Sequence, residues 1–375
     1  MRLCQTRNMR LLAAGILLGS LGFAQIQPGQ VDPNRAANSS VNPEPTPSDE
    51  GKISTTVFNV VAPTTVLDKN GSYINGLTLQ DFTLYDKGVP QNITADVSFA
   101  PISMVIAIQR SNNLQEILPK IQADGLLLAN NVVGENGEAA VLAFDHEVKL
   151  YQDFTSDPGK IEQAVKSLTA RGYNSRLNDA VAEAIRMLRG RDKSRRRVIL
   201  LISEKRDKAS ESRLRETLHE AQFANVSIYA IDVSSFVAKV TEKPKYPRPE
   251  PIPTTAQHVP GGAAQTPTTV DQIYNNGNYI PVFVDIFKGV KGLFVDDTVD
   301  VFTRFTGGKQ YTFVTNKTLE RVTTALGEEL HSQYLLAYSP NNKKEGGYHD
   351  IKVVVNRPNL EVRTRPGYWS GPLQE

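Results

Sequence analysis

Apolar residues in the middle of the chain follow two alternating patterns. Short continuous apolar runs are typical of strands buried on both faces. They occupy residues 104–108, 138–144, 197–202 and 226–233. Between these runs, apolar residues recur every three or four positions, in residues 114–128, 161–168, 177–188 and 214–221. This spacing predicts amphipathic helices. Strands that alternate with helices indicate a Rossmann-like, doubly wound α/β domain with a mostly parallel sheet.

Further elements extend this domain. Residues 147–152 are predicted to form an antiparallel neighbour of the second strand. After a long irregular stretch, the pattern predicts a helix, a short strand and a second helix, at residues 297–305, 309–313 and 319–330. A Gly-Gly pair at 307–308 ends the first of these helices, as glycine commonly does.

The two flanks of this region have the pattern of antiparallel β structure. Strands are predicted N-terminally at residues 56–61, 82–85 and 93–99, and C-terminally at 333–338, 349–356 and 360–364. A β unit of about 45 residues is marginally stable alone. We therefore expect both chain ends to form one small β-rich domain beside the α/β domain.

These patterns divide the chain into successive parts. They are a signal peptide (1–24), a flexible leader (25–53), an N-terminal β unit (54–100), an α/β domain (101–332) with a Pro-rich insertion (241–270), and C-terminal strands (333–369). The leader and the insertion are rich in proline and polar residues. Such composition cannot offset the entropy of ordering the chain.

The first residues have the pattern of an export signal. Arg2, Arg7 and Arg10 precede an apolar stretch at residues 11–23, and small residues suit cleavage before Gln25. The stretch is shorter than the roughly 20 residues of a membrane span, although an uncleaved anchor is an alternative. No later apolar run reaches that length. We expect an exported protein, periplasmic or extracellular, with no stable membrane span after cleavage.

Charge and cysteine content exclude several classes. The only cysteine, Cys4, lies in the signal, so the mature chain has no disulfide and no thiolate chemistry. Loss of the three signal arginines leaves 39 basic residues of 42, against 40 acidic residues. This balance argues against nucleic acid as a partner. The densest basic cluster, residues 189–197, lies between a helix and a strand and is interpreted as a solvated loop.

Three segments resemble the von Willebrand factor type A domain. They are residues 104–113 (Met-Val-Ile-Ala-Ile-Gln-Arg-Ser-Asn-Asn), residues 172–180 (Gly-Tyr-Asn-Ser-Arg-Leu-Asn-Asp-Ala) and residues 198–205 (Val-Ile-Leu-Leu-Ile-Ser-Glu-Lys). With the flanking segments 76–91, 333–340 and 362–368, the chain resembles the exported type A-related proteins abundant in acidobacteria. The resemblance covers about residues 54–369.

The resemblance implies a Mg²⁺ site at the carboxyl end of the sheet. Type A domains build it from Asp-x-Ser-x-Ser, a threonine and Asp-Gly. The corresponding positions here are Gln109, Ser111, Asn113, Ser175 and Glu204. Glu204 is the only carboxylate among them, and Lys205 beside it adds an opposing charge. Mg²⁺ prefers carboxylate oxygens, so we expect a degenerate site that binds Mg²⁺ weakly, and no other cofactor. Asp145 and Asp179 could restore the charge only if the loops rearranged.

No catalytic constellation accompanies these segments. The histidines have no metal-ligand spacing, and no serine lies in a strand-to-helix elbow. The resemblance therefore implies a non-enzymatic protein that binds an unidentified protein partner by adhesion at the bacterial envelope. Two alternatives stay open. One is a structural scaffold of an envelope assembly that contacts partners through residues 241–270; the other is a hydrolase without a recognisable motif.

Overall fold

The computed structural model describes residues 59–123, 136–241, 297–313, 316–341 and 346–371. All of them belong to the unit that runs from Thr56 to Glu375. The expected signal peptide and leader lie outside the described residues, as does the insertion 241–270 apart from its first residue. Among the described residues, no helix has both the length and the apolar character needed to cross a membrane.

A six-stranded sheet forms the centre of the α/β region. Its order is β10-β9-β8-β5-β6-β7. The bounds are β5 (Ile102–Gln109), β6 (Glu138–Phe144), β7 (Val148–Thr155), β8 (Arg196–Ser203), β9 (Val226–Asp232) and β10 (Gln310–Thr312). Only β7 runs antiparallel to its neighbour. Every residue of β5 is buried, as expected of a strand covered on both faces. The prediction of a mixed α/β fold with a mostly parallel sheet is confirmed.

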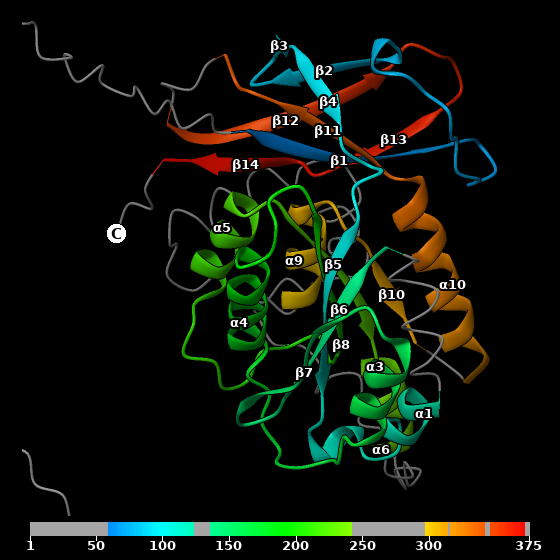
Figure 1. The fold of residues 1–375 in the computed structure, drawn as a ribbon, viewed down its shortest axis with the longest axis vertical. Helices are drawn as coiled ribbons and strands as arrows, with labels where there is room; N and C mark the ends of the chain where they lie inside the picture. Colours follow the sequence, from blue (N-terminus) through cyan, green and yellow to red (C-terminus); the bar gives the residue numbers. More distant parts are fainter. Residues whose placement is uncertain (1–58, 124–135, 242–296, 314–315, 342–345, 372–375) are drawn as a thin grey trace, which may run out of the picture. The chain divides into compact units, whose positions relative to one another are not determined.

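Helices cover both faces of this sheet (Figure 1). They are α1 (Leu118–Ala123), α3 (Pro158–Lys166), α4 (Leu177–Arg189), α5 (Leu214–Phe223), α6 (Ser234–Thr241), α9 (Thr298–Thr306) and α10 (Asn316–Ser332). Alternate residues of β5 point to opposite faces. Ile106 packs in the core beneath α1, α3 and α10, whereas Ala107 packs in the core beneath α4, α5 and α9. The period of two in a strand separates these two cores.

Both chain ends contribute to two four-stranded antiparallel sheets, seen together in Figure 1. One has the order β13-β1-β11-β4, built from β1 (Val60–Leu67), β4 (Ile93–Asp96), β11 (Tyr334–Tyr338) and β13 (Glu361–Thr364). The other has the order β14-β12-β2-β3, built from β2 (Phe82–Asp86), β3 (Val89–Gln91), β12 (Gly347–Val355) and β14 (Gly367–Ser370). Side chains of both sheets share one apolar core, among them Leu84 and Leu336. We call this pair of sheets the composite β region.

Several predicted elements differ in extent. The strand predicted at 56–61 is observed at Val60–Leu67, where Pro63 lies within the pairing to β11. The strand predicted at 93–99 ends at Asp96. The sequence pattern missed β3 and β14, because both are short and lack an alternating run.

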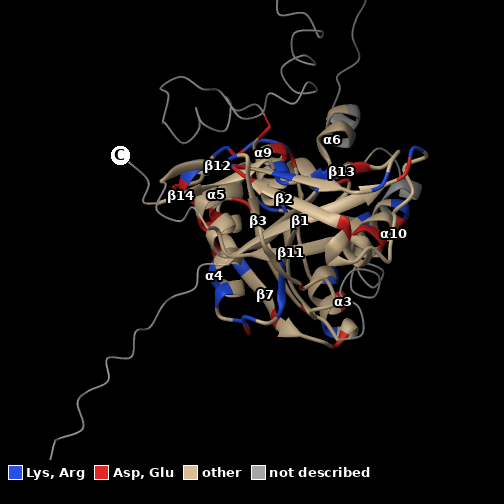
Figure 2. Ribbon diagram, turned by 90° about the horizontal axis from the view of Figure 1, so that it is seen from above, with Lys and Arg blue, Asp and Glu red and all other residues tan. Residues whose placement is uncertain are grey.

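The basic cluster at 189–197 is in part an exposed loop between α4 and β8, as predicted, but its last two arginines belong to β8. Arg196 is buried and donates to the Leu330 carbonyl and to Gln333 Oε1, at 2.5 and 2.6 Å. Arg191 forms a bidentate pair with Glu138, at 2.7 and 2.6 Å. These partners come from distant parts of the chain, which a local pattern cannot reveal. Elsewhere, basic and acidic segments are interspersed along the ribbon (Figure 2).

Candidate functional site

The candidate site lies at the carboxyl ends of β5 and β8. The chain runs outward from β5 through β6 and β7, and then returns to place β8 on the other side of β5. The connections that follow β5 and β8 therefore leave toward opposite faces of the sheet, which is where open α/β sheets commonly bind ligands. Gln109 is the last residue of β5, and Glu204 directly follows β8.

N–H donors surround the Glu204 carboxylate. Its Oε2 atom accepts hydrogen bonds from Gln109 Nε2 at 2.8 Å and Asn113 Nδ2 at 3.3 Å. The Lys208 ammonium donates to the same oxygen at 3.2 Å. Gln109 Nε2 also donates to Ser111 Oγ at 2.8 Å. Four of the five predicted positions are thus joined in one network.

The Gln109 amide has both of its ends engaged. Its Oε1 atom accepts the backbone N–H of Glu204 at 2.9 Å, while its amino group points at the Glu204 carboxylate. A divalent cation requires oxygen atoms turned toward it. Here the amide oxygen that could serve is bound to the backbone, and the carboxylate oxygen is bound to nitrogen donors.

The fifth predicted position, Ser175, does not share this network through its side chain. Its Oγ atom is buried and has no hydrogen-bond partner within the described residues. Its carbonyl accepts the backbone N–H groups of Lys208 and Ala209, at 3.0 and 3.2 Å. Ser175 therefore ties the loop before α4 to the loop after β8 through its backbone.

The lysine that pairs with Glu204 is Lys208, whereas Lys205, expected to add a positive charge beside the site, pairs with other carboxylates. The Lys205 ammonium lies 3.0 Å from Asp297 Oδ2 and 3.8 Å from Asp232 Oδ2. Burial lowers the pKa of Lys205, but the hydrogen bond and charge of Asp297, helped by Asp232, outweigh burial and raise that pKa above its ordinary value. Lys205 and Lys208, on the same loop, thus pair with different carboxylates.

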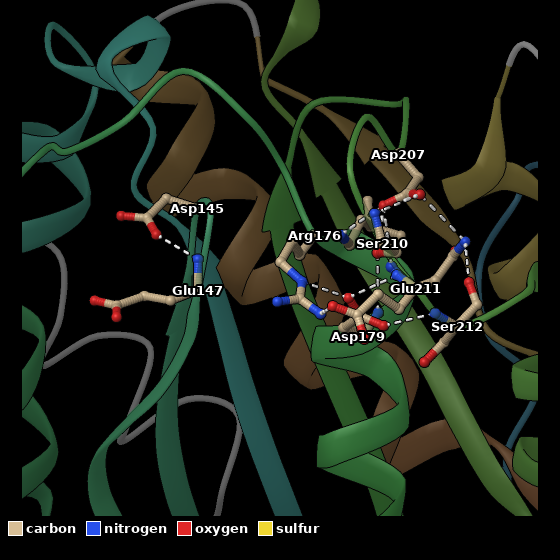
Figure 3. A network of polar contacts seen from close by, with 10 residues as sticks. Asp145, Glu147, Arg176, Asp179, Asp207, Ser210, Glu211 and Ser212 are labelled. Atoms are coloured by element: carbon tan, nitrogen blue, oxygen red, sulfur yellow. Dashed lines mark hydrogen bonds and ion pairs between the residues drawn. The ribbon is translucent and has the colours of Figure 1, made fainter.

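A second polar network holds the start of α4 (Figure 3). Asp207 Oδ1 accepts the backbone N–H of Leu177 at 2.8 Å and the hydroxyl of Ser210 at 2.6 Å. Ser210 Oγ in turn accepts the backbone N–H of Asp179 at 3.1 Å. These contacts satisfy N–H groups that the first turn of a helix leaves without intrahelical partners. The loop after β8 therefore caps α4.

Asp179 also links the loop before α4 to the loop after β8, and its carboxylate is bonded there and not to the Glu204 network. Its carboxylate accepts the backbone N–H of Ser212 at 2.8 Å and of Glu211 at 3.1 Å, and Arg176 Nε lies 2.6 Å away. Burial raises the pKa of Asp179, but the Ser212 hydrogen bonds and then Arg176 outweigh it, so the pKa lies below its ordinary value.

Asp145, the other acidic residue expected near the site, is also engaged. Asp145, His146 and Glu147 offer ligand atoms within 4.8 Å of one another, an arrangement that could hold a metal ion. However, Arg110 Nη2 lies 3.2 Å from Asp145 Oδ2 and 2.8 Å from Glu147 Oε1. Asp145 Oδ1 also accepts the Glu147 backbone N–H at 2.9 Å (Figure 3). A guanidinium supplies the positive charge in this cluster.

One aromatic side chain stands out on the loop that leads to Ser175. Tyr173 is 75% exposed, and Gly172 before it has a φ of 70°, which places the loop in the left-handed region that favours glycine. The sequence reasoning singled out neither Tyr173 nor the roles of Lys208, Asp207 and Arg110. All four lie outside the compared ligand positions, so only their proximity to the site could have drawn attention to them.

Comparison with known proteins finds a family match over part of the chain. A family model described as von Willebrand factor type A domain matches residues 105–206, which include all five compared positions. No curated protein matches the chain.

Solved structures give weaker likenesses. One is the SpRpn10 VWA domain, with 17% identity over 36% of this chain and 76% of that chain, and a TM-score of 0.30. Another is the conserved hypothetical protein BatB from Bacteroides thetaiotaomicron, with 15% identity over 35% of this chain and 66% of that chain, and a TM-score of 0.30. A third is the vWF domain of the type V pili tip protein Mfa5 from Porphyromonas gingivalis, with 22% identity over 28% of this chain and 38% of that chain, and a TM-score of 0.26. These values carry no argument about a ligand. The family match thus covers residues 105–206, where this chain is similar to the von Willebrand factor type A domain.

Proposed function

We propose that this chain is an exported, non-enzymatic protein that binds a protein partner through the carboxyl end of its type A domain without a divalent cation. Type A domains commonly mediate interactions between proteins. The proposal of export is supported by Arg2, Arg7 and Arg10 ahead of the apolar stretch at residues 11–23. N-terminal sequencing of the mature protein tests that part, and a start at Gln25 is the expected result.

One observation carries the proposal of a metal-free site. Glu204 is the only carboxylate among the compared positions, and its Oε2 atom already accepts from Gln109, Asn113 and Lys208. Binding of Mg²⁺ to this oxygen would require these donors to leave it, and the Lys208 ammonium would repel the ion. Loss of an anionic ligand weakens affinity for such cations further. The Lys208 ammonium thus supplies positive charge where relatives of this fold hold a metal.

Calorimetric titration of the mature protein with Mg²⁺ and Mn²⁺ tests this idea. We expect no saturable heat from the natural chain. A combined variant, Gln109→Asp, Asn113→Ser, Glu204→Asp and Lys208→Gln, rebuilds the carboxylates and removes the ammonium, and it should gain saturable Mn²⁺ binding. Micromolar binding by the natural chain that Glu204→Ala abolishes would overturn the proposal.

Tyr173 is the side chain best placed to anchor a partner on this face. Interface energy concentrates in a few aromatic and arginine residues, and loss of such an anchor costs about 2 kcal/mol or more. Arg171, two residues before Tyr173 on the same loop, has a side chain that is 62% exposed and lies 3.6 Å from Glu147 Oε1. The loops around Tyr173 are fixed by the hydrogen bonds of the Ser175 carbonyl and the Asp207 carboxylate. A surface that is already ordered loses less conformational entropy on binding.

Affinity capture from envelope extract, followed by titration of the captured partner, tests this surface. Tyr173→Ala should weaken the partner about 30-fold, the equivalent of 2 kcal/mol. Phe99→Ala is the matched control, because Phe99 is 95% exposed and lies between β4 and β5, at the opposite end of the sheet. A chelator should leave binding unchanged. Equal affinities of the two variants, or loss of the partner on chelation, would contradict the proposal.

A further inference from the structure

A cavity of about 250 Å³ lies at the end of the central sheet opposite to Glu204. Its wall comes from the amino ends of β8 and β9, from β1 and β11 of the composite β region, and from Arg365 between β13 and β14. Five of the lining residues are cationic, and none is a carboxylate. They are Lys193, Arg195, Arg196, Arg197 and Arg365. The charged residues that line the cavity are therefore all positive.

Arg365 is the most unusual residue of this wall. It is 3% exposed, and its Nε atom is buried without a hydrogen-bond partner within the described residues. Its guanidinium carbon lies 5.6 Å from the centre of the Tyr368 ring. Asp86, whose charge acts on it, is already bonded to His349, Tyr338 and Tyr368. A buried guanidinium is normally paired, because loss of hydration is costly without an acceptor.

Two neighbouring arginines in the wall have neutral acceptors only. Arg196 is 5% exposed and donates to the Leu330 carbonyl and Gln333 Oε1, while its Nε has no partner. Arg197 donates to the carbonyls of Ala224 and Arg191, and its Nε is likewise buried without a partner. Arg195, by contrast, lies 3.3 Å from the Glu138 carboxylate. Three guanidinium groups therefore line one cavity with no carboxylate bonded to any of them.

We propose that this cavity binds a small oxyanion, a carboxylate or a phosphate, with Arg365 as its principal partner. Guanidinium groups present planar sets of donors that match both kinds of oxyanion. The volume suits inorganic phosphate or a short dicarboxylate, and it is below the range usual for larger ligands. Because both chain ends and the α/β region contribute to the wall, the anion would hold these parts together. This inference is independent of the function proposed for the opposite end of the sheet.

Thermal unfolding of the mature protein, followed by the fluorescence of its single tryptophan, tests the proposal. Phosphate and succinate are titrated separately against chloride at constant ionic strength. A ligand that binds only the folded state raises the unfolding temperature in a saturable manner. We expect saturation with at least one of the two anions. A lower half-saturating concentration for one of them assigns its class, and either assignment supports the proposal.

Substitutions at the cavity separate binding from general salt effects. Arg365→Gln should weaken the anion about tenfold or more, as loss of a charge-assisted hydrogen bond would. Arg186→Gln is the matched control, because the Arg186 side chain is 72% exposed and paired with Glu183 away from the cavity. If Arg365→Gln fails to fold, Lys193→Gln and Arg197→Gln provide the same comparison. An identical dependence on anion for all variants, or no saturation with either anion, would overturn the proposal.

The variant Arg365→Met gives a second, opposite readout. Without an oxyanion, methionine removes an unpaired buried charge, so this variant should unfold at a higher temperature than the natural chain. At saturating oxyanion the order should reverse, because only the natural chain gains from binding. If the natural chain is the more stable of the two without oxyanion as well, water or the ring of Tyr368 satisfies Arg365 and the proposal fails.

Discussion

Replacement of Asp86 by asparagine should destabilise the composite β region strongly. Asp86 is fully buried at the end of β2. Its Oδ1 atom lies 2.6 Å from His349 Nδ1, and its Oδ2 atom accepts the hydroxyls of Tyr338 and Tyr368, both at 2.9 Å. Asp86 belongs to the N-terminal strands and its three partners to the C-terminal ones. The carboxylate is therefore a polar link between the two chain ends inside their shared core.

The size of the effect follows from these contacts. Removal of one partner from a buried charged network costs about 3–5 kcal/mol. An asparagine keeps one acceptor oxygen but turns an N–H donor toward groups that need an acceptor. We therefore expect Asp86→Asn to lower the free energy of unfolding by about 3 kcal/mol, the low end of that range.

The same network predicts a dependence on pH. Burial raises the pKa of Asp86, but hydrogen bonds from His349, Tyr368 and Tyr338 together outweigh it and hold that pKa below its ordinary value of 3.8. A carboxyl with a lowered folded pKa contributes its full stabilisation above the unfolded pKa and loses it as the pH falls through the folded pKa. The difference between the natural chain and the variant should be constant near neutral pH and shrink below about pH 4.

Urea unfolding followed by the fluorescence of Trp369 measures both effects, because this tryptophan lies on β14 next to Tyr368. Glu361→Gln is the control, since Glu361 is an exposed carboxylate of the same region. A loss below about 1 kcal/mol, typical of an exposed position, would refute the reasoning. So would a difference between Asp86→Asn and the natural chain that persists unchanged in acid.

Three further predictions follow from other parts of the fold. Gly308→Ala should destabilise the protein by about 3 kcal/mol or prevent folding, because its Cβ would lie 1.9 Å from the Ile228 carbonyl oxygen, and a normal urea midpoint would contradict this. Glu138→Gln should cost about 1–2 kcal/mol in the same assay, because it removes the bidentate charge on Arg191, and an unchanged midpoint would show that this pair contributes nothing. Deletion of residues 241–270 should leave partner affinity unchanged in the capture assay, and loss of the partner would favour the scaffold hypothesis.

The sequence predicted the central fold because its signals are local. A strand buried on both faces is continuous in apolar residues, as in β8, and an amphipathic helix repeats its apolar side chains every three or four residues, as in α4. The strands of the composite β region were predicted less well. β1 was displaced and the edge strand β14 was missed, because strand pairing in the composite β region depends on partners far along the chain, as in the pairing of Thr64 with Thr364.

At the candidate site, the sequence located the positions but not their contacts. Alignment of the segments identified Gln109 and Glu204, which the fold brings within hydrogen-bonding distance across 95 residues of sequence. It drew attention to the positive charge of Lys205 but not to Lys208, which pairs with Glu204. The path of a loop and the rotamers of its side chains decide which of two nearby lysines reaches a carboxylate, and neither is a property of local sequence.

The sequence by itself determined the α/β scaffold and the identities of the five compared positions, because residue identity and short-range periodicity suffice for both. Only the tertiary structure decided how the remaining charges are satisfied. In the structure, the Lys208 ammonium pairs with Glu204, and Asp86 links strands from the two chain ends. Arg365 lines a cavity, and its buried Nε has no hydrogen-bond partner within the described residues. The physical reason is that solvation and pairing of a charge depend on everything within a few ångströms of it, and those neighbours come from the whole chain.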